Sequence, residues 1–238
     1  MLHYDHLIDR VAAARRSVMI NSTRSSRQMT TWIEEFREAL HDKSADFGVK
    51  LAETDIERLS DYYALLLKWN PRLHLVASCS PEEFATRHIL ESLVLIHHLP
   101  LNARVADIGS GAGLPLIPCL LVRRDLRITL IDSSQRKLIF LREALRHANS
   151  VTPSRLIGRR FEDIPSPEVE FITCRALDRF EKLLPKFIDW APTNCRLLLF
   201  AGIALRKQLE TMFPRAKSEQ IPGSARRFLV EVNVTAPT

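Results

Sequence analysis

The sequence lacks the features that mark membrane, secreted and metal-binding proteins. No apolar run approaches the roughly 18 uninterrupted residues that span a bilayer, and no charged-then-apolar secretory leader is visible. The four cysteines lie far apart and form no C-x-x-C pair, which argues against both a zinc site and a disulfide framework. We therefore expect a protein of the cytoplasm that acts without a membrane and without a metal.

Two common phosphate-binding motifs are also missing. The chain contains no G-x-x-x-x-G-K-[ST] loop, and its clustered glycines read G-x-G-x-G, with Leu114 where a dinucleotide fingerprint has its third glycine. The chain has only seven glycines, and three of them are Gly109, Gly111 and Gly113. This spacing indicates that the backbone turns sharply around a ligand that is not a pyrophosphate.

The glycines follow a short apolar run, so the pattern predicts a buried strand from Arg104 to Ile108 and a helix that begins at about Gly113. The Asp107 carboxylate would repel a pyrophosphate but would suit a cationic or neutral adenosyl ligand. A D-x-G-x-G sequence after a strand resembles motif I of the class I S-adenosylmethionine-dependent methyltransferases. The alternative is an ordinary strand-to-helix turn with a buried aspartate cap.

Length and charge set broader bounds. A chain of 238 residues with 46% hydrophobic content can bury one substantial α/β core and a smaller appended element. The formal charge is +6, and arginines occur in pairs at 123–124, 159–160 and 226–227. Such an excess is compatible with a nucleic acid partner, although each arginine alone is equally compatible with a solvated surface.

Composition divides the chain into three parts. We expect an extension at residues 1–50, a helical cap at 51–101 and the main domain at 102–238. Within the cap, Thr54 is the predicted N-cap of a helix that ends at Asn70, because the residue before a proline avoids helical conformation. A second helix is predicted to begin after Ser80 and to end at about His98.

Strands and helices alternate in the main domain. Strands are predicted at 104–108, 127–131, 154–157, 169–174 and 196–200, with helices at 113–122, 134–147 and 180–190, and with an exposed final strand within 224–234. This order predicts an α/β fold with a doubly wound, mostly parallel sheet. In such sheets ligands bind beyond the carboxyl ends of the strands. Those ends carry Asp107, Gly109, Asp132, Glu162 and Arg175.

Four short segments resemble, in order and spacing, the RsmG (GidB) family. They are Leu67–Pro71, His88–Ser92, Asp107–Pro115 and Cys174–Ala176. The resemblance covers roughly residues 50 to 232. It implies a Rossmann-like methyltransferase that uses S-adenosylmethionine to methylate N7 of a guanine in small-subunit (16S) ribosomal RNA. The implied partner is ribosomal RNA or the small ribosomal subunit, and we expect a monomer.

The resemblance also implies roles for particular residues. Asp132 would accept hydrogen bonds from the two ribose hydroxyls, and Phe161 would lie against the adenine unless it is a core aromatic. Arg175 is the one candidate catalytic residue, and it would orient either the cofactor or the guanine. The implied cofactor-binding residues are Asp107, Gly109, Gly111, Gly113, Leu114, Asp132, Phe161, Glu162 and Arg175. The candidate RNA-binding residues are Arg123, Arg124, Arg136, Lys137, Arg159, Arg226 and Arg227.

Four positions depart from the family pattern. The family usually has Ser at Cys174, Asp at Glu91, Asn-Leu-Thr at 74–76, and Lys-Gly at 201–202, where this chain has Ala-Gly. The missing lysine bears on the acceptor more than on the fold. Two other functions therefore stay open: a methyltransferase of the same fold with another RNA or a small molecule as substrate, and a non-catalytic RNA-binding relative.

Overall fold

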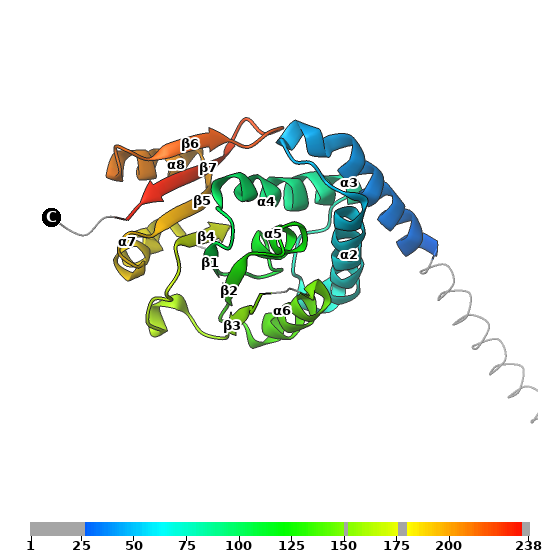
Figure 1. The fold of residues 1–238 in the computed structure, drawn as a ribbon, viewed down its shortest axis with the longest axis horizontal. Coiled ribbons are helices and arrows are strands. Elements are labelled where there is room, and N and C mark those ends of the chain that lie inside the picture. The colour runs from blue at the N-terminus through cyan, green and yellow to red at the C-terminus, as the bar shows by residue number, and fades with distance from the viewer. Residues whose placement is uncertain (1–26, 150–151, 176–179, 235–238) are drawn as a thin grey trace, which may run out of the picture.

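The computed structural model describes residues 27–149, 152–175 and 180–234, and Figure 1 shows their arrangement. Most of the predicted extension and Ala176 of the fourth resemblance segment lie outside the described residues. The predicted boundaries between the three parts of the chain stay predictions.

A single sheet of seven strands forms the centre of the molecule, in the order β3-β2-β1-β4-β5-β7-β6. Strands β1 to β5 are parallel, whereas β7 runs antiparallel to both β5 and β6. The strands are β1 Arg104–Ile108, β2 Arg127–Ile131, β3 Arg155–Ile157, β4 Phe171–Arg175, β5 Arg196–Gly202, β6 Lys217–Gln220 and β7 Arg227–Asn233. The predicted doubly wound, mostly parallel α/β fold is confirmed.

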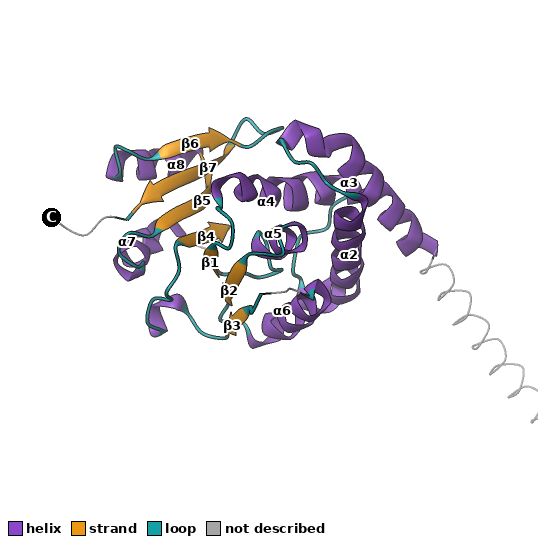
Figure 2. Ribbon diagram, in the orientation of Figure 1, coloured by secondary structure: helices purple, strands orange, loops and turns teal. Residues whose placement is uncertain are grey.

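Helices cover both faces of this sheet (Figure 2). One face packs against α5 Leu116–Val122 and α6 Gln135–Ala148, which in turn contact the cap helix α2 Glu53–Leu73. The other face packs against α7 Phe180–Trp190 and α8 Ile203–Met212. Two apolar cores result, one on each side of the sheet.

Most predicted elements of the main domain occur where the apolar pattern places them, with three differences. The helix after β1 begins at Leu116 and not at Gly113, because Gly113 has a left-handed φ of 85°. The final strand is not exposed, since β7 lies between two other strands and buries Phe228 to Val230. The sequence analysis did not identify β6 or α8.

The predicted boundaries of α2 are wrong at both ends. Its N-cap is Ala52, whose amide donates to the Asp55 carboxylate over 3.0 Å, so the helix begins one residue before Thr54. The helix also continues through Pro71 to Leu73. Pro71 lies in the last turn, where a missing N–H removes one hydrogen bond from a helix that is about to end.

The second cap helix is a continuous helical segment, residues 81–98, that changes type along its length. Its parts are α3 Pro81–Glu83, a π-helical stretch η2 Phe84–Leu90, α4 Glu91–Leu93 and a 3-10 stretch η3 Val94–His98. Ser80 is its N-cap, as predicted, and accepts from the Glu83 amide over 3.1 Å. We refer to these residues as segment 81–98.

A further helix, residues 27–43, packs against the cap and is followed by η1 Ser44–Phe47. The Phe36 ring is fully buried and stacks on Tyr63 with 4.5 Å between the ring centroids. This helix therefore shares the apolar core of the cap. In the described parts of the chain, none of the helices is both long and apolar enough to cross a membrane.

One buried hydrogen bond attaches the cap to the glycine turn. The Tyr62 hydroxyl on α2 donates to the Ala112 carbonyl over 2.7 Å, and both residues are buried. Since Ala112 lies between Gly111 and Gly113, α2 holds this turn from outside the sheet.

We predict that Tyr62→Phe lowers the free energy of unfolding by about 1–3 kcal/mol, because the buried Ala112 carbonyl loses its partner. Urea denaturation measures the loss. Tyr63→Phe is the matched control, since the Tyr63 hydroxyl makes no hydrogen bond within the described residues. Equal losses in the two variants would contradict the assigned role of Tyr62.

Candidate functional site

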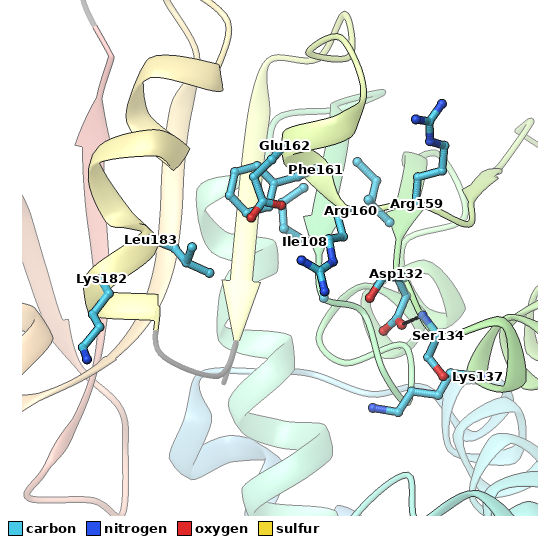
Figure 3. A pocket seen from close by; sticks show the side chains of 13 residues that line it. Ile108, Asp132, Ser134, Lys137, Arg159, Arg160, Phe161, Glu162, Lys182 and Leu183 are labelled. Atoms are coloured by element: carbon cyan, nitrogen blue, oxygen red, sulfur yellow. Dashed lines mark hydrogen bonds between the residues drawn. The ribbon is translucent and has the colours of Figure 1, made fainter.

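A cavity of about 770 Å³ opens at the carboxyl ends of β1 and β2, next to the point where the strand order reverses. This volume suits a drug-sized or cofactor-sized ligand. Figure 3 shows the lining residues, which come from the ends of β1 and β2, the glycine turn, the loops after β2 and β3, and the helices α6 and α7. They are Ile108, Gly109, Ile131–Ser134, Lys137, Arg159–Glu162, Lys182 and Leu183.

Asp132 is fixed in the cavity wall by two backbone amides. One carboxylate oxygen accepts from the Gly111 amide over 2.7 Å, and the other accepts from the Ser134 amide over 2.8 Å. Each carboxylate oxygen has two lone pairs, so both retain acceptor capacity for a ligand. The paired acceptors suit two adjacent hydroxyl groups, as the sequence analysis predicts for ribose.

The glycine turn is built from left-handed backbone. Gly109, Gly111 and Gly113 have φ angles of 72°, 54° and 85°. A Cβ at Gly113 would lie 2.4 Å from the Ile117 side chain, so only glycine permits α5 to pack this closely on the turn. The turn thereby places Gly109 in the lining of the cavity, with Gly111 donating its amide to the Asp132 side chain in the cavity wall.

Asp107 is fully buried at the end of β1, and neither of its carboxylate oxygens has a hydrogen-bond partner within the described residues. Burial raises the pKa of this carboxyl to about 8, and the nearby Asp132 carboxylate acts in the same direction. Ser110 and Arg175 act against this rise. A buried polar group without a partner is rare, and this one fits a site that a cationic or hydrogen-bonding ligand completes.

Phe161 both lines the cavity and belongs to the core. It opens the short helix η4 Phe161–Asp163, and its ring is nearly buried. The ring meets those of Phe187 and Trp190 edge-on, at centroid distances of 5.6 and 5.4 Å. The two interpretations of Phe161 from sequence are therefore compatible, while Glu162 lies beside it in the cavity lining.

Basic side chains surround the cavity. Lys137 lines it from the first turn of α6, the helix whose N-cap is Ser134. In Figure 3 Lys137 and Arg160 extend toward the cavity, whereas the Arg159 guanidinium points away.

The sequence analysis missed several lining residues: Ser133, Ser134, Arg160, Lys182 and Leu183. Ser133 and Ser134 directly follow Asp132 at the end of β2, and this position was a usable signal. Lys182 and Leu183 come from α7, far along the chain, and no local pattern indicates that they reach the cavity.

Arg175 lies at the same edge of the sheet but does not line this cavity. Its guanidinium donates to Ser92 Oγ over 3.0 Å, to two carbonyls of segment 81–98 and to Glu91. Gly111, Gly113 and Leu114 are also absent from the lining of the cavity, although they belong to the turn beside it. The structure thus gathers Gly109, Asp132, Phe161 and Glu162 around one space, with Asp107 buried behind it.

The predicted RNA-binding residues do not form one surface. Arg123 lies at the opposite, amino edge of the sheet, where it donates to the carbonyls of Leu99 and Pro100. Arg136 donates to the Arg72 carbonyl over 2.8 Å and so links α6 to α2. Arg226 is exposed at the start of β7, and Arg227 forms an ion pair with Glu91 over 2.7 Å. An RNA contact by any of these residues stays a prediction.

No group of three or more histidine, cysteine or acidic side chains in the described ranges could hold a metal ion.

We predict that Asp107→Asn changes how stability depends on pH. The pKa of the folded wild type is about 8, against an ordinary value of 3.8. Between these values the unfolded chain releases a proton that the folded chain keeps, so wild-type stability falls as pH rises. The asparagine variant has no ionisable group at this position, so it lacks this pH dependence. The free energy of unfolding of the variant, relative to that of the wild type, should therefore be higher at pH 8 than at pH 5. Urea denaturation at both pH values measures this, and a pH-independent difference would contradict the prediction.

Solved structures resemble this fold at low sequence identity. The P. horikoshii TYW2 structure, in complex with MeSAdo, matches with a TM-score of 0.50 and 13% identity, over 62% of each chain. At this identity the likeness concerns the fold alone.

Curated relatives are closer in sequence. The chain is 31% identical to ribosomal RNA small subunit methyltransferase G of Sorangium cellulosum, over 84% of each protein. It is 37% identical to the protein of that name from Xanthomonas oryzae pv. oryzae, over 72% of this chain and 83% of the relative. The GidB family model, described as rRNA small subunit methyltransferase G, matches residues 55–231. This match covers well over half of the sequence, and the chain therefore belongs to the GidB family.

Proposed function

We propose that this protein transfers a methyl group from S-adenosylmethionine to N7 of a guanine in small-subunit ribosomal RNA, in the cytoplasm. One observation carries the proposal: in a member of the GidB family, a cavity at the switch point of the sheet has Asp132 in its wall and the unpartnered Asp107 behind it. Both carboxylates suit a ligand that presents hydroxyls and a positive charge.

The residues present fit the proposed cofactor. Asp132 keeps acceptor capacity for the ribose hydroxyls after its two backbone hydrogen bonds. Phe161 supplies an apolar wall for the adenine, with Glu162 beside it. Asp107 would meet positive charge on the methionine part, and the glycine turn would approach that part with its backbone. We propose that this turn contacts the cofactor through Gly109, Gly111, Gly113 and Leu114.

When bound, S-adenosylmethionine supplies a methyl group activated by its positively charged sulfur. N7 of guanine carries a lone pair in the neutral base, so no residue has to remove a proton before the transfer. The work left to the chain is to hold N7 in line with the methyl group and to exclude water. The described residues that line the cavity include no histidine that could act as a base, which agrees with this mechanism.

The acceptor must be an unpaired guanine or one that is extruded from folded RNA, because a base in a helix could not reach the carboxyl edge. The excess of cations suits such a partner. Arg175 marks the direction from which the guanine would enter, since it ends β4 beside the glycine-turn strand β1. We propose that Arg175 acts on the acceptor side of the reaction.

A second substrate is favoured by one observation. The end of β5 carries Ala201, which is buried and uncharged, where the family pattern has a lysine. A methyltransferase of this fold with another RNA as acceptor is consistent with that difference.

The test is to incubate the protein with S-adenosylmethionine that carries a labelled methyl group, together with small ribosomal subunits or bare ribosomal RNA. We expect label on N7 of one guanine of the small-subunit RNA, located by cleavage at the modified base. Label on another RNA would favour the second substrate. Absence of label from all RNA, together with no heat on titration with the cofactor, would overturn both.

We predict that Asp107→Asn weakens S-adenosylmethionine binding by about 1–3 kcal/mol, a factor of about 5 to 150, because the asparagine side chain cannot ionise to become a charged partner when the cation binds. Isothermal titration calorimetry measures the affinity. Asp61→Asn makes the same chemical change on the exposed face of α2 and should leave the affinity unchanged. Unchanged affinity in the Asp107 variant would mean that the cofactor site lies elsewhere.

A further inference from the structure

Three arginines meet around one buried carboxylate, Glu91, at the carboxyl edge of the sheet. Arg87 and Glu91 belong to segment 81–98, Arg175 ends β4, and Arg227 begins β7. In the sheet register Arg175 pairs with Phe200 of β5, and Arg227 pairs with Gly202 at the end of the same strand. We call Arg87, Arg175 and Arg227 the arginine cluster. It lies at the ends of β4 and β5 and at the start of β7, whereas the cavity lies on the same edge of the sheet at β1 and β2.

Glu91 divides its two carboxylate oxygens between two of the arginines. Oε1 forms an ion pair with Arg227 Nη2 over 2.7 Å, and Oε2 accepts from Arg175 Nη2 over 3.3 Å. The Glu91 side chain is only 3% exposed, so water contributes little to its solvation. A carboxylate this deeply buried is strongly tied to both partners, and it sets the separation of the two guanidiniums.

The hydrogen-bond donors of Arg175 are used within the protein. Its Nη1 donates to the His88 carbonyl and to Ser92 Oγ, and its Nη2 donates to the Arg87 carbonyl and to Glu91. The guanidinium also lies 5.4 Å from the centre of the Phe200 ring. With four donor contacts and 15% exposure, Arg175 anchors segment 81–98 to the sheet.

Arg227 is differently placed. Its side chain is 34% exposed, Nη2 is held by Glu91, and Nε donates to Ser224 Oγ over 3.1 Å. Within the described residues its Nη1 has no protein partner. One side of the guanidinium is thus fixed and the other is available to a ligand.

The charges around this open side favour an anion. Arg175 and Arg227 share the Glu91 carboxylate. Arg87 forms an ion pair with Glu83, and it also acts on Glu91 electrostatically. Burial and the cations Arg175 and Arg87 lower the pKa of His88 to about 4, so its imidazole is neutral at pH 7. A guanidinium presents two parallel N–H donors, which match the oxygens of a phosphate. For a protein that acts on RNA, an anion that suits this open side is a backbone phosphate.

We infer that Arg227 contacts a phosphate of the RNA that carries the acceptor base, and that Glu91 is the positioning residue that holds Arg227 for this contact. The inference rests on the proposed function, and it deepens the description of the acceptor side. Arg175 then acts on the acceptor by fixing the helical segment from which Glu91 projects.

The experiment measures binding of bare small-subunit ribosomal RNA at several salt concentrations, without cofactor, for the full chain and its variants. Arg227→Ala should reduce the slope of log affinity against log salt by about one, as expected for the loss of one phosphate contact. Arg227→Lys should keep the slope, because the charge remains. An unchanged slope in Arg227→Ala would overturn the inference.

Glu91→Gln separates position from charge. The substitution removes a negative charge from a basic cluster, so electrostatics alone would strengthen RNA binding. Loss of position should instead weaken it, by about tenfold, and raise the KM for RNA more than it lowers kcat. Tighter RNA binding by this variant would overturn the positioning role.

Two further variants guard against general damage to the fold. Glu91→Asp keeps the charge and should retain RNA binding within about threefold. Glu170→Gln makes the same substitution in an exposed arginine–glutamate pair, with Arg104 at the amino edge, and should leave RNA binding unchanged. If Glu170→Gln weakens binding as much as Glu91→Gln, the inference fails.

The readouts also distinguish this inference from the proposed function. RNA binding that depends on Arg227, without methylation of small-subunit RNA, would overturn the proposed reaction and keep the phosphate contact. Methylation of small-subunit RNA, together with a wild-type salt slope in Arg227→Ala, would keep the proposed reaction and overturn the phosphate contact.

Discussion

The hydrogen bond from the Gly111 amide to the Asp132 carboxylate is the contact on which the site depends. It joins the end of β2 to the turn after β1, so that two strand ends share one wall. The Ser134 amide donates to the other oxygen of the same carboxylate and fixes the start of α6, which carries Lys137 to the cavity. Tyr62 supports this arrangement from outside through the Ala112 carbonyl. A single carboxylate thus organises a turn, a helix start and a ligand wall.

The two halves of the carboxyl edge differ in their buried charges. On the side of β1 and β2, the buried charged groups are the carboxylates Asp107 and Asp132, and Asp107 is left without a partner within the described residues, while basic side chains line the cavity around them. On the side of β4, β5 and β7, arginines outnumber carboxylates, and Glu91 is shared between two of them. Under the proposed function, the buried carboxylates of the first half would meet the cationic donor, and the arginines of the second half would meet the polyanionic acceptor.

Sequence patterns predicted the strands well because a buried parallel strand is a short apolar run, as at 104–108 and 127–131, and such a run needs no tertiary information. They predicted the end of α2 poorly, because Pro71 is tolerated in a last turn. They missed β6 because all four residues of Lys217–Gln220 are exposed, so the strand has no apolar alternation. The strand ends indicated Gly109, Asp132, Phe161 and Glu162, and these four residues lie in the lining of one cavity. They could not place Lys137 inward, nor predict that Glu91, Arg175 and Arg227 meet, since side-chain contacts between distant segments leave no local pattern.

The antiparallel place of β7 affects the order in which the site can form. The chain reaches β7 last, yet this strand lies inside the sheet and carries Arg227 back to Glu91. During synthesis the residues of the donor cavity, from Gly109 to Leu183, are therefore all made before the acceptor edge can close. Without β7, Glu91 would lack Arg227, the second of its two ion-pair partners, and β5 would lack its partner on that edge. The ion pair between Arg227 and Glu91 can therefore form only after β7 has joined the sheet, and an incompletely folded chain would lack this ion pair.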